Sequence, residues 1–343
     1  MNIAKPLLEW YDIHKRALPW RGADDPYRIW LSEIMLQQTR AETVKSYYAR
    51  FLEAFPDARA LAEADEEQVL KLWEGLGYYA RARNLHAAAK RIADTGFPDT
   101  SEGLRALPGV GPYAANAIAS IAFGESAPAL DGNQARVLAR LTAHDQPLKT
   151  PFDLESTARR LMADTSRPGD YNQALMDLSA MICAPKKPNC AACPLSGLCA
   201  AHAEREEEHY PVRLPKAAKK EEDVLVILVT DGHGHIAIRR RPSKGMLGGL
   251  YEFCLTEPAD AAAYLIDQGF TYPAFLRALP PSKHVFTHRI WRMNGQLFRA
   301  ERFPEGYTAA DSLSPYAFPT ALRVYTGIAA ELLKEQQTED ETI

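Results

Sequence analysis

Leu107 to Asn133 reads LPGVGPYAANAIASIAFGESAPALDGN, and this stretch decides how the first half of the chain folds. Gly109 and Gly111 flank Val110 and predict a tight turn, and Pro112 follows at a position that suits the first turn of a helix. The first two thirds of the stretch carry no charge, but its glycines, its proline and its small residues argue against a membrane span. We therefore predict two helices joined by a short Gly-Val-Gly turn.

The predicted turn is a candidate anion site. The first N–H groups of a helix lack acceptors within the helix, and glycines keep side chains away from them. Gly109, Val110 and Gly111 are therefore candidate contacts for a phosphate group. Asp131 and Asn133 lie just beyond the predicted helix and can place a carboxylate near whatever the turn holds. An ordinary helix-turn-helix corner, with Asp131 or Asn133 capping the next helix, explains the same residues without a ligand.

Glu33 is the second candidate for chemistry. It lies in a predicted helix from Tyr27 to about Thr39, on one face with Ile29, Trp30, Leu36 and Gln37. Apolar neighbours disfavour the ionised carboxyl, so we expect a raised pKa, as a general acid near neutral pH requires. A glutamate on the surface of an amphipathic helix is the ordinary alternative. Gln37 and Gln38 end this helix with polar groups that can reach base edges or simply close a helix.

Global charge says nothing about a nucleic-acid partner, because the net charge is −4 and the pI is near 6.2. Local charge is more informative. After Gly75-Leu76-Gly77-Tyr78-Tyr79 the chain carries Arg81, Arg83, Lys90 and Arg91 with no acid before Asp94. A basic patch with aromatic neighbours fits a groove for a phosphate backbone, and a solvated helix face is the alternative.

Four cysteines, Cys183, Cys190, Cys193 and Cys199, lie within seventeen positions. The first nine residues have no sustained apolar core, so no signal peptide is expected and we predict a cytoplasmic protein with reduced thiols. In that setting the four thiols predict a ligand set instead of two disulfides. Spacing leaves a four-thiolate zinc site and an iron-sulfur cluster both open.

The chain changes character after Cys199. Helical periodicity dominates before residue 200, and no segment there alternates as a strand would. We predict a helical region over 1–203, a charged and proline-containing linker over 204–221, and an α+β domain over 222–343. Strands are expected at Val224 to Val229, Ile236 to Arg240, Leu250 to Leu255 and His284 to Arg299, with helices near 259–268 and 322–333.

Several motifs occur together in a fixed order. They are PYRIWLSEIMLQQT, WEGLGYYARARNLHAAAK, LPGVGPYAANAIA, ALDGNQARVLAR and the four-cysteine spacing. This set resembles the MutY adenine DNA glycosylases of the helix-hairpin-helix superfamily and covers residues 10–200 almost without interruption. In the second half, RPSKGMLGGLYEF and HVFTHRI resemble the C-terminal domain of that family, a relative of the Nudix fold. The implied fold is an all-α N-terminal half with a cluster loop, followed by an α+β Nudix-like domain.

The resemblance implies hydrolytic removal of adenine mispaired with 8-oxoguanine or G in double-stranded DNA, after the adenine is flipped out. Glu33 would protonate the base, and Asp131 would stabilise the positively charged sugar. Tyr113 and Asn133 would support the sugar and Asp131. The protein would work as a monomer, away from membranes, and would join the nucleoid when bound to DNA.

The resemblance also implies roles for the remaining candidates. Gln38 and Tyr78 would wedge into the duplex, with Gln37 beside them. The turn from Gly109 to Gly111 would hold phosphate, and the four cysteines would bind a 4Fe-4S cluster. The loop Phe286, Thr287 and His288 would recognise 8-oxoguanine, although Thr287 stands where a serine is common in the family.

Three alternatives stay open at this point. A glycosylase and lyase of the endonuclease III kind needs a lysine at the hairpin, and none occurs between Leu107 and Leu148. A DNA-binding module without catalysis would not need the pair Glu33 and Asp131. A Nudix hydrolase in 222–343 would need an acidic catalytic box, and Glu252 is alone in its segment.

Overall fold

The computed structural model describes residues 2–163, 165–212, 218–243 and 245–340. The chain divides into two compact units, one of residues 1–64 and 84–216 and the other of residues 65–83 and 217–343. The division falls inside helix α6 (Ala80–Thr95), between Arg83 and Asn84. Across the described ranges, no helix combines the length and the apolar character needed to cross a bilayer.

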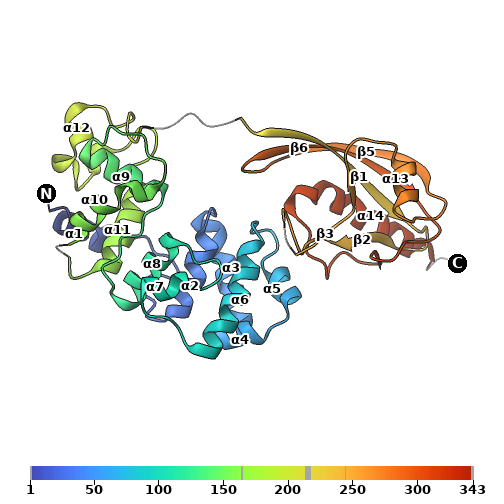
Figure 1. The fold of residues 1–343 in the computed structure, drawn as a ribbon, viewed down its shortest axis with the longest axis horizontal. Helices are drawn as coiled ribbons and strands as arrows, with labels where there is room; N and C mark the ends of the chain where they lie inside the picture. The colour runs from blue at the N-terminus through green and yellow to red at the C-terminus, as the bar shows by residue number, and fades with distance from the viewer. Residues whose placement is uncertain (1, 164, 213–217, 244, 341–343) are drawn as a thin grey trace. The chain divides into compact units, whose positions relative to one another are not determined.

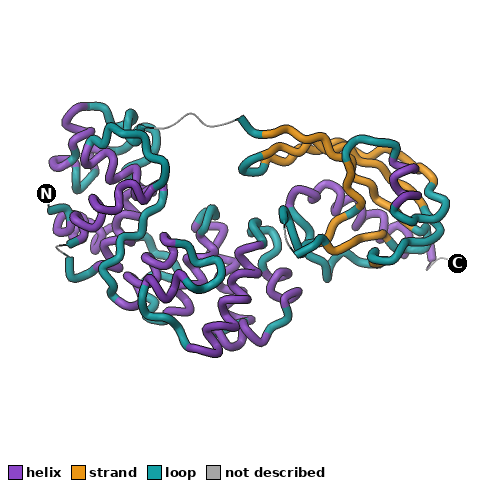
Figure 2. Tube along the Cα trace, viewed as in Figure 1, coloured by secondary structure: helices purple, strands orange, loops and turns teal. Residues whose placement is uncertain are grey.

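The first unit is built from helices, as Figure 2 shows. The described residues before position 200 contain no strand, so the prediction of an all-α first half is confirmed. Besides the last part of α6, the unit contains α1 (Ala4–His14), α2 (Pro26–Leu36), α3 (Ala41–Ala54), α4 (Ala58–Glu63), α7 (Ser101–Arg105), α8 (Pro112–Phe123), α9 (Gly132–Thr142), η1 (Pro151–Leu154), α10 (Glu155–Met162), α11 (Pro168–Met181), η2 (Cys190–Ala192), η3 (Ser196–Leu198) and α12 (Ala200–Glu204).

Helix α8 packs against α2, α7 and α11 (Figure 1). Its small residues from Ala114 to Ser120 are all buried. Their size lets neighbouring helices approach closely: a Cβ added at Gly169 of α11 would lie 2.7 Å from the carbonyl oxygen of Ser120. The uncharged stretch is therefore a central core helix, which explains why it could be confused with a membrane span.

The predicted hairpin turn forms between α7 and α8. Pro112 is the first residue of α8, and Gly111 is its N-cap with φ −81°. Gly109 has φ +75°, and an added Cβ there would lie 2.6 Å from Cβ of Asn84. The conformation and the close contact both require glycine at position 109. The sequence predicted this turn correctly from its glycine spacing.

Gly109→Ala should destabilise the fold by about 1–3 kcal/mol, because an alanine is strained at positive φ and meets Asn84. Gly111→Ala is the matched control, since its φ is ordinary and nothing lies within 4 Å of the added Cβ. Urea unfolding of both variants gives the comparison. Equal losses at the two positions would contradict this account of the turn.

Helix α1 is shorter than predicted. The helical spacing of Leu7, Leu8, Tyr11 and Leu18 predicts a helix over residues 5–18, but α1 ends at His14. The backbone N–H of Arg16 donates to Asp177 Oδ2 at 3.1 Å, and its Nε donates to Oδ1 at 2.7 Å. Asp177 is fully buried, so satisfying its charge outweighs another turn of helix.

The second unit is built around a mixed sheet of seven strands, ordered β3-β2-β1-β6-β5, with β4 paired to β1 and β7 to β2. β1 and β6 run parallel, and the other pairs are antiparallel. The strands of the sheet are β1 (Lys220–Thr230), β2 (Ile236–Arg240), β3 (Tyr251–Glu252), β4 (Cys254–Thr256), β5 (Ala274–Val285), β6 (Arg289–Arg299) and β7 (Thr308–Ala310). The same unit contains the helices α13 (Ala261–Asp267), η4 (Thr320–Leu322) and α14 (Arg323–Asp340).

The second half of strand β1, from Leu225 to Thr230, is buried on both faces. Val226 and Leu228 pack in a core with Tyr325 of α14, whereas Ile227 packs in a second core with Leu265 of α13. A strand covered on both sides is apolar at every position, which is why Val224 to Val229 has no alternation. The α+β prediction for this half of the chain is confirmed.

The predicted strand from His284 to Arg299 is two strands. β5 ends at Val285, the loop Phe286 to His288 reverses the chain, and β6 begins at Arg289. The long β5 was not predicted, because Pro280 and Pro281 interrupt its pattern. They are tolerated since β5 is an edge strand with a register shift between Leu279 and Ser282.

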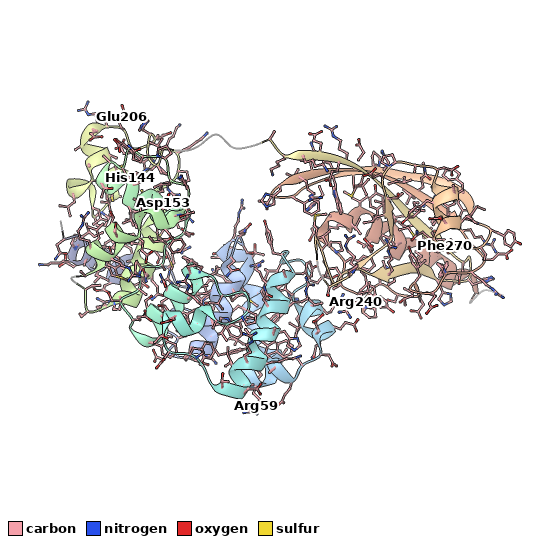
Figure 3. All side chains as sticks on the ribbon, viewed as in Figure 1. Arg59, His144, Asp153, Glu206, Arg240 and Phe270 are labelled. Carbon is pink, nitrogen blue, oxygen red and sulfur yellow. The ribbon has the colours of Figure 1, made fainter. Side chains whose placement is uncertain are left out.

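The second unit also includes residues 65–83, which contain α5 (Glu66–Leu72) and the start of α6. Arg240, labelled in Figure 3, donates to Glu66 Oε1 at 3.0 Å. The hydroxyl of Tyr79 donates to the carbonyl of Phe318 at 3.1 Å. No local sequence pattern predicts these contacts, and the domain boundaries at 203 and 222 stay a prediction.

Candidate functional site

Glu33 lies in the middle of α2 and is 5% exposed. The helix begins with Asp25 as N-cap and Pro26 as first residue, and its long apolar run buries one face against α8. Glu33 therefore enters the interior on the same face as its apolar neighbours. Its Oε2 atom has no hydrogen-bond partner among the described residues. A buried carboxylate oxygen without a partner is unusual and marks a candidate site.

Burial raises the pKa of Glu33 to about 7. The guanidinium of Arg21 and the hydroxyl of Tyr113 limit the rise, and the negative charge of Asp131 adds to it. Burial, together with the negative charges of Glu33 and Asp131, holds the pKa of Tyr113 well above its usual range. Glu33, Tyr113 and Asp131 therefore share one electrostatic neighbourhood. The raised pKa that the sequence predicted for Glu33 is present in the structure.

The raised pKa of Glu33 makes folding stability depend on pH. Between its ordinary value of 4.5 and about 7, the folded protein keeps a proton that the unfolded chain releases. The stabilisation that Glu33 contributes is therefore fully present below pH 4.5. As the pH rises to about 7 this contribution is lost, and the free energy of unfolding falls by up to about 3 kcal/mol. Urea unfolding of Glu33→Gln and the parent is compared at pH 5 and at pH 8. Relative to the parent, the variant should be more stable at pH 8 than at pH 5. A difference that does not change with pH would contradict the assignment.

A pocket lies beside Glu33, lined by Tyr113, by other residues of α2, α3, α8 and α11, and by the segment between α1 and α2. Asp177 holds two arginines of the pocket wall in place. Its carboxylate accepts hydrogen bonds from Arg16, as described above, and from Nη2 of Arg21 at 2.9 Å. Ile29 and Leu36, which the sequence placed on the same helix face as Glu33, also line the pocket. The remaining lining residues were not predicted: Arg16, Leu18, Trp20, Arg21, Ser32, Ala41, Ile121, Gln173 and Met176. No local pattern joins residues 16–21 to residues 173–177, so only folding reveals this wall.

Asp131 is the N-cap of α9. Its Oδ1 accepts from the backbone N–H of Gln134 at 3.1 Å, and its Oδ2 accepts from Asn133 Nδ2 at 3.0 Å. The capping alternative is therefore correct as a description of its hydrogen bonds. Capping and chemistry are compatible, because the half-buried carboxylate acts electrostatically on Glu33 and Tyr113.

Asn133 connects Asp131 to the cysteine loop. Its Oδ1 accepts from Nη1 of Arg136 at 3.0 Å, and Nε of Arg136 donates to the carbonyl of Cys183 at 3.0 Å. Arg136 is 4% exposed, and its Nη2 also donates to the carbonyl of Ser179. A continuous hydrogen-bonded path thus runs from Asp131 to the first cysteine. The sequence had suggested only that Asn133 supports Asp131.

The hairpin residues differ in exposure. Val110 is 6% exposed, and its N–H donates to the carbonyl of Leu107 at 3.2 Å, so this residue anchors the turn. Gly109 and Gly111 leave the N-terminal end of α8 without covering side chains. The arrangement can accept an anion at Gly111 and the first turn of α8.

Gln37 and Gln38 follow α2. Gln37 is its C-cap, and Gln38 is exposed with φ +56°. Tyr78, in the other unit, is 50% exposed and has φ +50°. Positive φ at a residue other than glycine is uncommon and is often found at functional sites. The structure does not test the roles of these three residues.

In the second unit, the hydroxyls of Tyr78 and Thr287 are 3.2 Å apart and share a hydrogen bond. The family resemblance had implied separate roles for them: Tyr78 would wedge into the duplex, and Thr287, 209 residues away, would help recognise 8-oxoguanine. Thr287 and His288 are exposed, whereas Phe286 packs partly into the core. The structure thus brings together two candidates that sequence reasoning treated separately.

All four predicted cysteines, Cys183, Cys190, Cys193 and Cys199, line one cavity. Burial raises the pKa of Cys190 to about 12 and that of Cys193 to about 11. Thiols in such a place become thiolates when a metal centre supplies positive charge. Four sulfurs around one cavity therefore fit a metal or cluster centre. A second donor group, of Cys190, His202 and Glu207, lies at the same place, with ligand atoms within 4.8 Å of one another.

Arg140 supports this interpretation. It is 2% exposed, and it takes part in none of the ion pairs of the described residues. Its Nη1 donates to Cys183 Sγ at 3.2 Å and to the carbonyl of Ala184 at 2.7 Å. A buried cation without a carboxylate partner is costly, and an anionic thiolate centre would balance it.

Comparison with known proteins defines the class. Residues 31–163 match the model of the HhH-GPD superfamily of base excision DNA repair proteins, and residues 225–326 match the NUDIX domain. The solved structure of a thermostable thymine-DNA glycosylase is 29% identical, with a TM-score of 0.54 over 59% of this chain and 95% of that chain. The helical half therefore has the fold of helix-hairpin-helix base excision repair proteins.

Two curated relatives narrow the class. The adenine DNA glycosylase of Schizosaccharomyces pombe is 36% identical over 312 residues, which are 72% of this chain and 68% of the relative. That of Arabidopsis thaliana is 39% identical over 309 residues, 76% of this chain and 49% of the relative. The chain belongs to the adenine DNA glycosylase family. It spans about half the length of the Arabidopsis relative, and 40% of the human one.

Proposed function

We propose that this protein removes adenine paired with 8-oxoguanine or G in double-stranded DNA by hydrolysing the N-glycosidic bond. It would act as a monofunctional glycosylase in base excision repair, after flipping the adenine out of the duplex. The observation that carries the proposal is a fully buried carboxyl, Glu33, whose pKa is raised to about 7 beside a pocket and within electrostatic reach of Asp131.

Glu33 has the properties of the general acid. Near neutral pH a large fraction of it is protonated, and the neutral carboxyl can donate to N7 of the adenine. Protonation makes the base a better leaving group, so the bond from C1′ of the sugar to N9 breaks and adenine departs neutral. The resulting carboxylate then accepts a proton from the water that adds to C1′. Atoms and charge balance, and Glu33 returns to its starting form.

Asp131 has the properties of the stabilising anion. The sugar becomes positively charged as the bond to the base breaks, and a fixed carboxylate lowers the energy of that state. Gln134 and Asn133 hold Asp131 in place, so little reorganisation is needed during the reaction. The division of labour between a neutral and an ionised carboxyl resembles that of glycoside hydrolysis.

The pocket would receive the extruded base. Arg16, Gln173 and Glu33 then offer polar groups, and Trp20, Leu18 and Ile29 offer apolar walls. Tyr113 would contact the sugar, and Gly111 with the first turn of α8 would hold a neighbouring phosphate.

Recognition of the opposite base is assigned to the second unit. Tyr78 would enter the duplex, and Phe286, Thr287 and His288 would read 8-oxoguanine. Gln37 and Gln38, which belong to the first unit, would also contact the DNA. The hydrogen bond between Tyr78 and Thr287 supports this assignment, because it holds an aromatic ring and a hydroxyl together on one exposed edge. A threonine keeps the hydroxyl that a serine would offer at this position.

A 4Fe-4S cluster is the proposed cofactor, held by Cys183, Cys190, Cys193 and Cys199, and it would order the loop between them. Purified protein should be brown and absorb visible light, with iron bound and zinc absent. Arg140→Met should lower the iron content, because the thiolates lose their cation, whereas Arg159→Met on the exposed face of α10 should not. Colourless protein with bound zinc would refute the cluster assignment.

The decisive experiment for this function is a single-turnover assay. Duplexes with A opposite 8-oxoguanine, G, C and T are compared, and release of adenine is expected for the first two. Strand cleavage and borohydride trapping should both be weak, since no lysine lies at the hairpin. Efficient trapping at the hairpin, or incision of thymine-glycol DNA, would favour a lyase of the endonuclease III kind.

We further propose that the protein acts in the cytoplasm, on the nucleoid, as a monomer. DNA affinity should fall steeply with salt despite the net charge of −4, because local cations displace counterions. A non-catalytic DNA-binding module would show the same salt dependence but no adenine release. A Nudix hydrolase in 222–343 would be revealed by turnover of 8-oxo-dGTP.

A further inference from the structure

The loop from Phe286 to His288 is held by the first residues of β1. Within the loop, the N–H of Phe286 donates to the carbonyl of Arg289 at 2.9 Å. The N–H of Lys220 donates to the carbonyl of His288 at 3.2 Å, and Nζ of Lys219 donates to the carbonyl of Phe286 at 2.7 Å. The carbonyls of Phe286 and His288 are both engaged, so the Thr287 side chain is left at the tip.

Glu222 is the charged centre of this arrangement. Its carboxylate accepts two bonds from Nη1 of Arg289, at 3.0 and 3.1 Å, and one from Nε1 of Trp291 at 3.0 Å. Lys220 completes the set, with Nζ 3.1 Å from Oε1. The bonds from Lys220, Trp291 and Arg289 lower the pKa of Glu222, so it stays ionised at neutral pH. Hydrogen bonds to an ionised group are stronger than neutral ones.

Three aromatic side chains, Trp291, Phe286 and His284, form a row that connects Glu222 to the loop. In the sheet, Trp291 is aligned with Glu222 on one side and with His284 on the other. The ring of Phe286 packs edge-on against Trp291, with centroids 4.9 Å apart, and against His284 at 4.5 Å. Fixing the indole of Trp291 therefore also fixes the ring of Phe286.

We propose that Glu222 and Lys219 are positioning residues that hold the Phe286 to His288 loop in the conformation that reads the base opposite adenine. Glu222 acts through Arg289 and Trp291 at the base of the loop, and Lys219 acts on its backbone. Neither residue needs to touch DNA. This inference rests on the proposed function, because the reading of the opposite base by the Phe286 to His288 loop is itself part of that proposal.

The neighbouring residue supplies a matched control. Glu221 pairs with Arg292 at 2.6 Å, and both side chains are at least half exposed. Because side chains alternate along a strand, Glu221 lies on the opposite face from Glu222 and from the aromatic row. Glu221→Gln removes one charge from the same strand and breaks an ion pair between the same two strands, without touching the loop.

The test uses the full-length protein and three variants: Glu222→Gln, Lys219→Met and Glu221→Gln. Single-turnover rates of adenine release are measured opposite 8-oxoguanine and opposite G. Glu222→Gln should lower the ratio of these rates about tenfold, the effect of weakening a charge-assisted bond, with the rate opposite G unchanged. Lys219→Met should lower the ratio less, and Glu221→Gln should leave it within about twofold of the parent.

Hydrogen exchange of residues 284–289 gives a readout independent of catalysis. Glu222→Gln should speed exchange there about tenfold in DNA-free protein, and Glu221→Gln should not. Unchanged exchange and an unchanged rate ratio in Glu222→Gln would overturn the proposal. A parent protein without preference for 8-oxoguanine would instead refute the reading role, while exchange still tests whether Glu222 holds the loop. If Glu222→Gln does not fold, the same measurements on Lys219→Met test the proposal, because this substitution removes only the exposed hydrogen bond to the carbonyl of Phe286.

Discussion

Glu33→Gln should reduce the single-turnover rate of adenine release by about a hundredfold to ten-thousandfold, the range for loss of a general acid. Glutamine keeps the shape of the side chain but cannot give a proton to the base. In the parent protein the rate should also decline as pH rises above about 7, where Glu33 loses its proton. That decline should be absent from the residual activity of Glu33→Gln.

Two controls separate chemistry from binding. Glu42→Gln, on the neighbouring helix α3, removes an exposed carboxylate and should leave the rate unchanged. Affinity of Glu33→Gln for duplex DNA should match the parent, because the side chain is buried and does not face the phosphate backbone. A variant with full activity, or one that fails only in DNA binding, would remove Glu33 from the mechanism.

Asp131→Asn should lower the rate by about a hundredfold to a thousandfold, because the developing positive charge on the sugar loses its anionic partner. The substitution is informative because asparagine caps helices about as well as aspartate. The bond to the backbone N–H of Gln134 can therefore survive, and the free energy of unfolding should change little. Rate and stability together distinguish a catalytic carboxylate from a capping one.

Asp57→Asn is the matched control for capping. Asp57 is the exposed N-cap of α4 and accepts from the N–H of Ala60 at 2.8 Å. Its conversion to asparagine should affect neither the rate nor stability. If Asp131→Asn were as active as Asp57→Asn, Asp131 would be only a cap, and the two-carboxylate mechanism would be wrong.

Local features of the site could be predicted from sequence because they depend on near neighbours. Glu33 among apolar residues of one helix implied burial and a raised pKa, and both are present. Gly109 and Gly111 implied a turn that only glycine can make at its first position. Four closely spaced cysteines implied one centre, and all four line one cavity.

Other features could not be predicted, because they join distant segments. The pocket wall depends on Asp177 binding Arg16 and Arg21, more than 150 positions earlier. No local pattern marks Arg136 and Arg140 as buried, yet both are buried against the cysteine loop. A long basic side chain has no periodic pattern that reveals which distant carbonyl it will meet.

The sequence by itself indicated the family through its ordered motifs. It also determined the all-α and α+β halves and the hairpin turn, since these follow from spacing within a helix, a strand or a loop. Only the tertiary structure shows which further candidates lie together: Asn133 with Cys183 through Arg136, and Tyr78 with Thr287. The physical reason is that a residue's immediate neighbours set its burial. The packing of whole elements, in contrast, sets which distant charge or hydroxyl it faces.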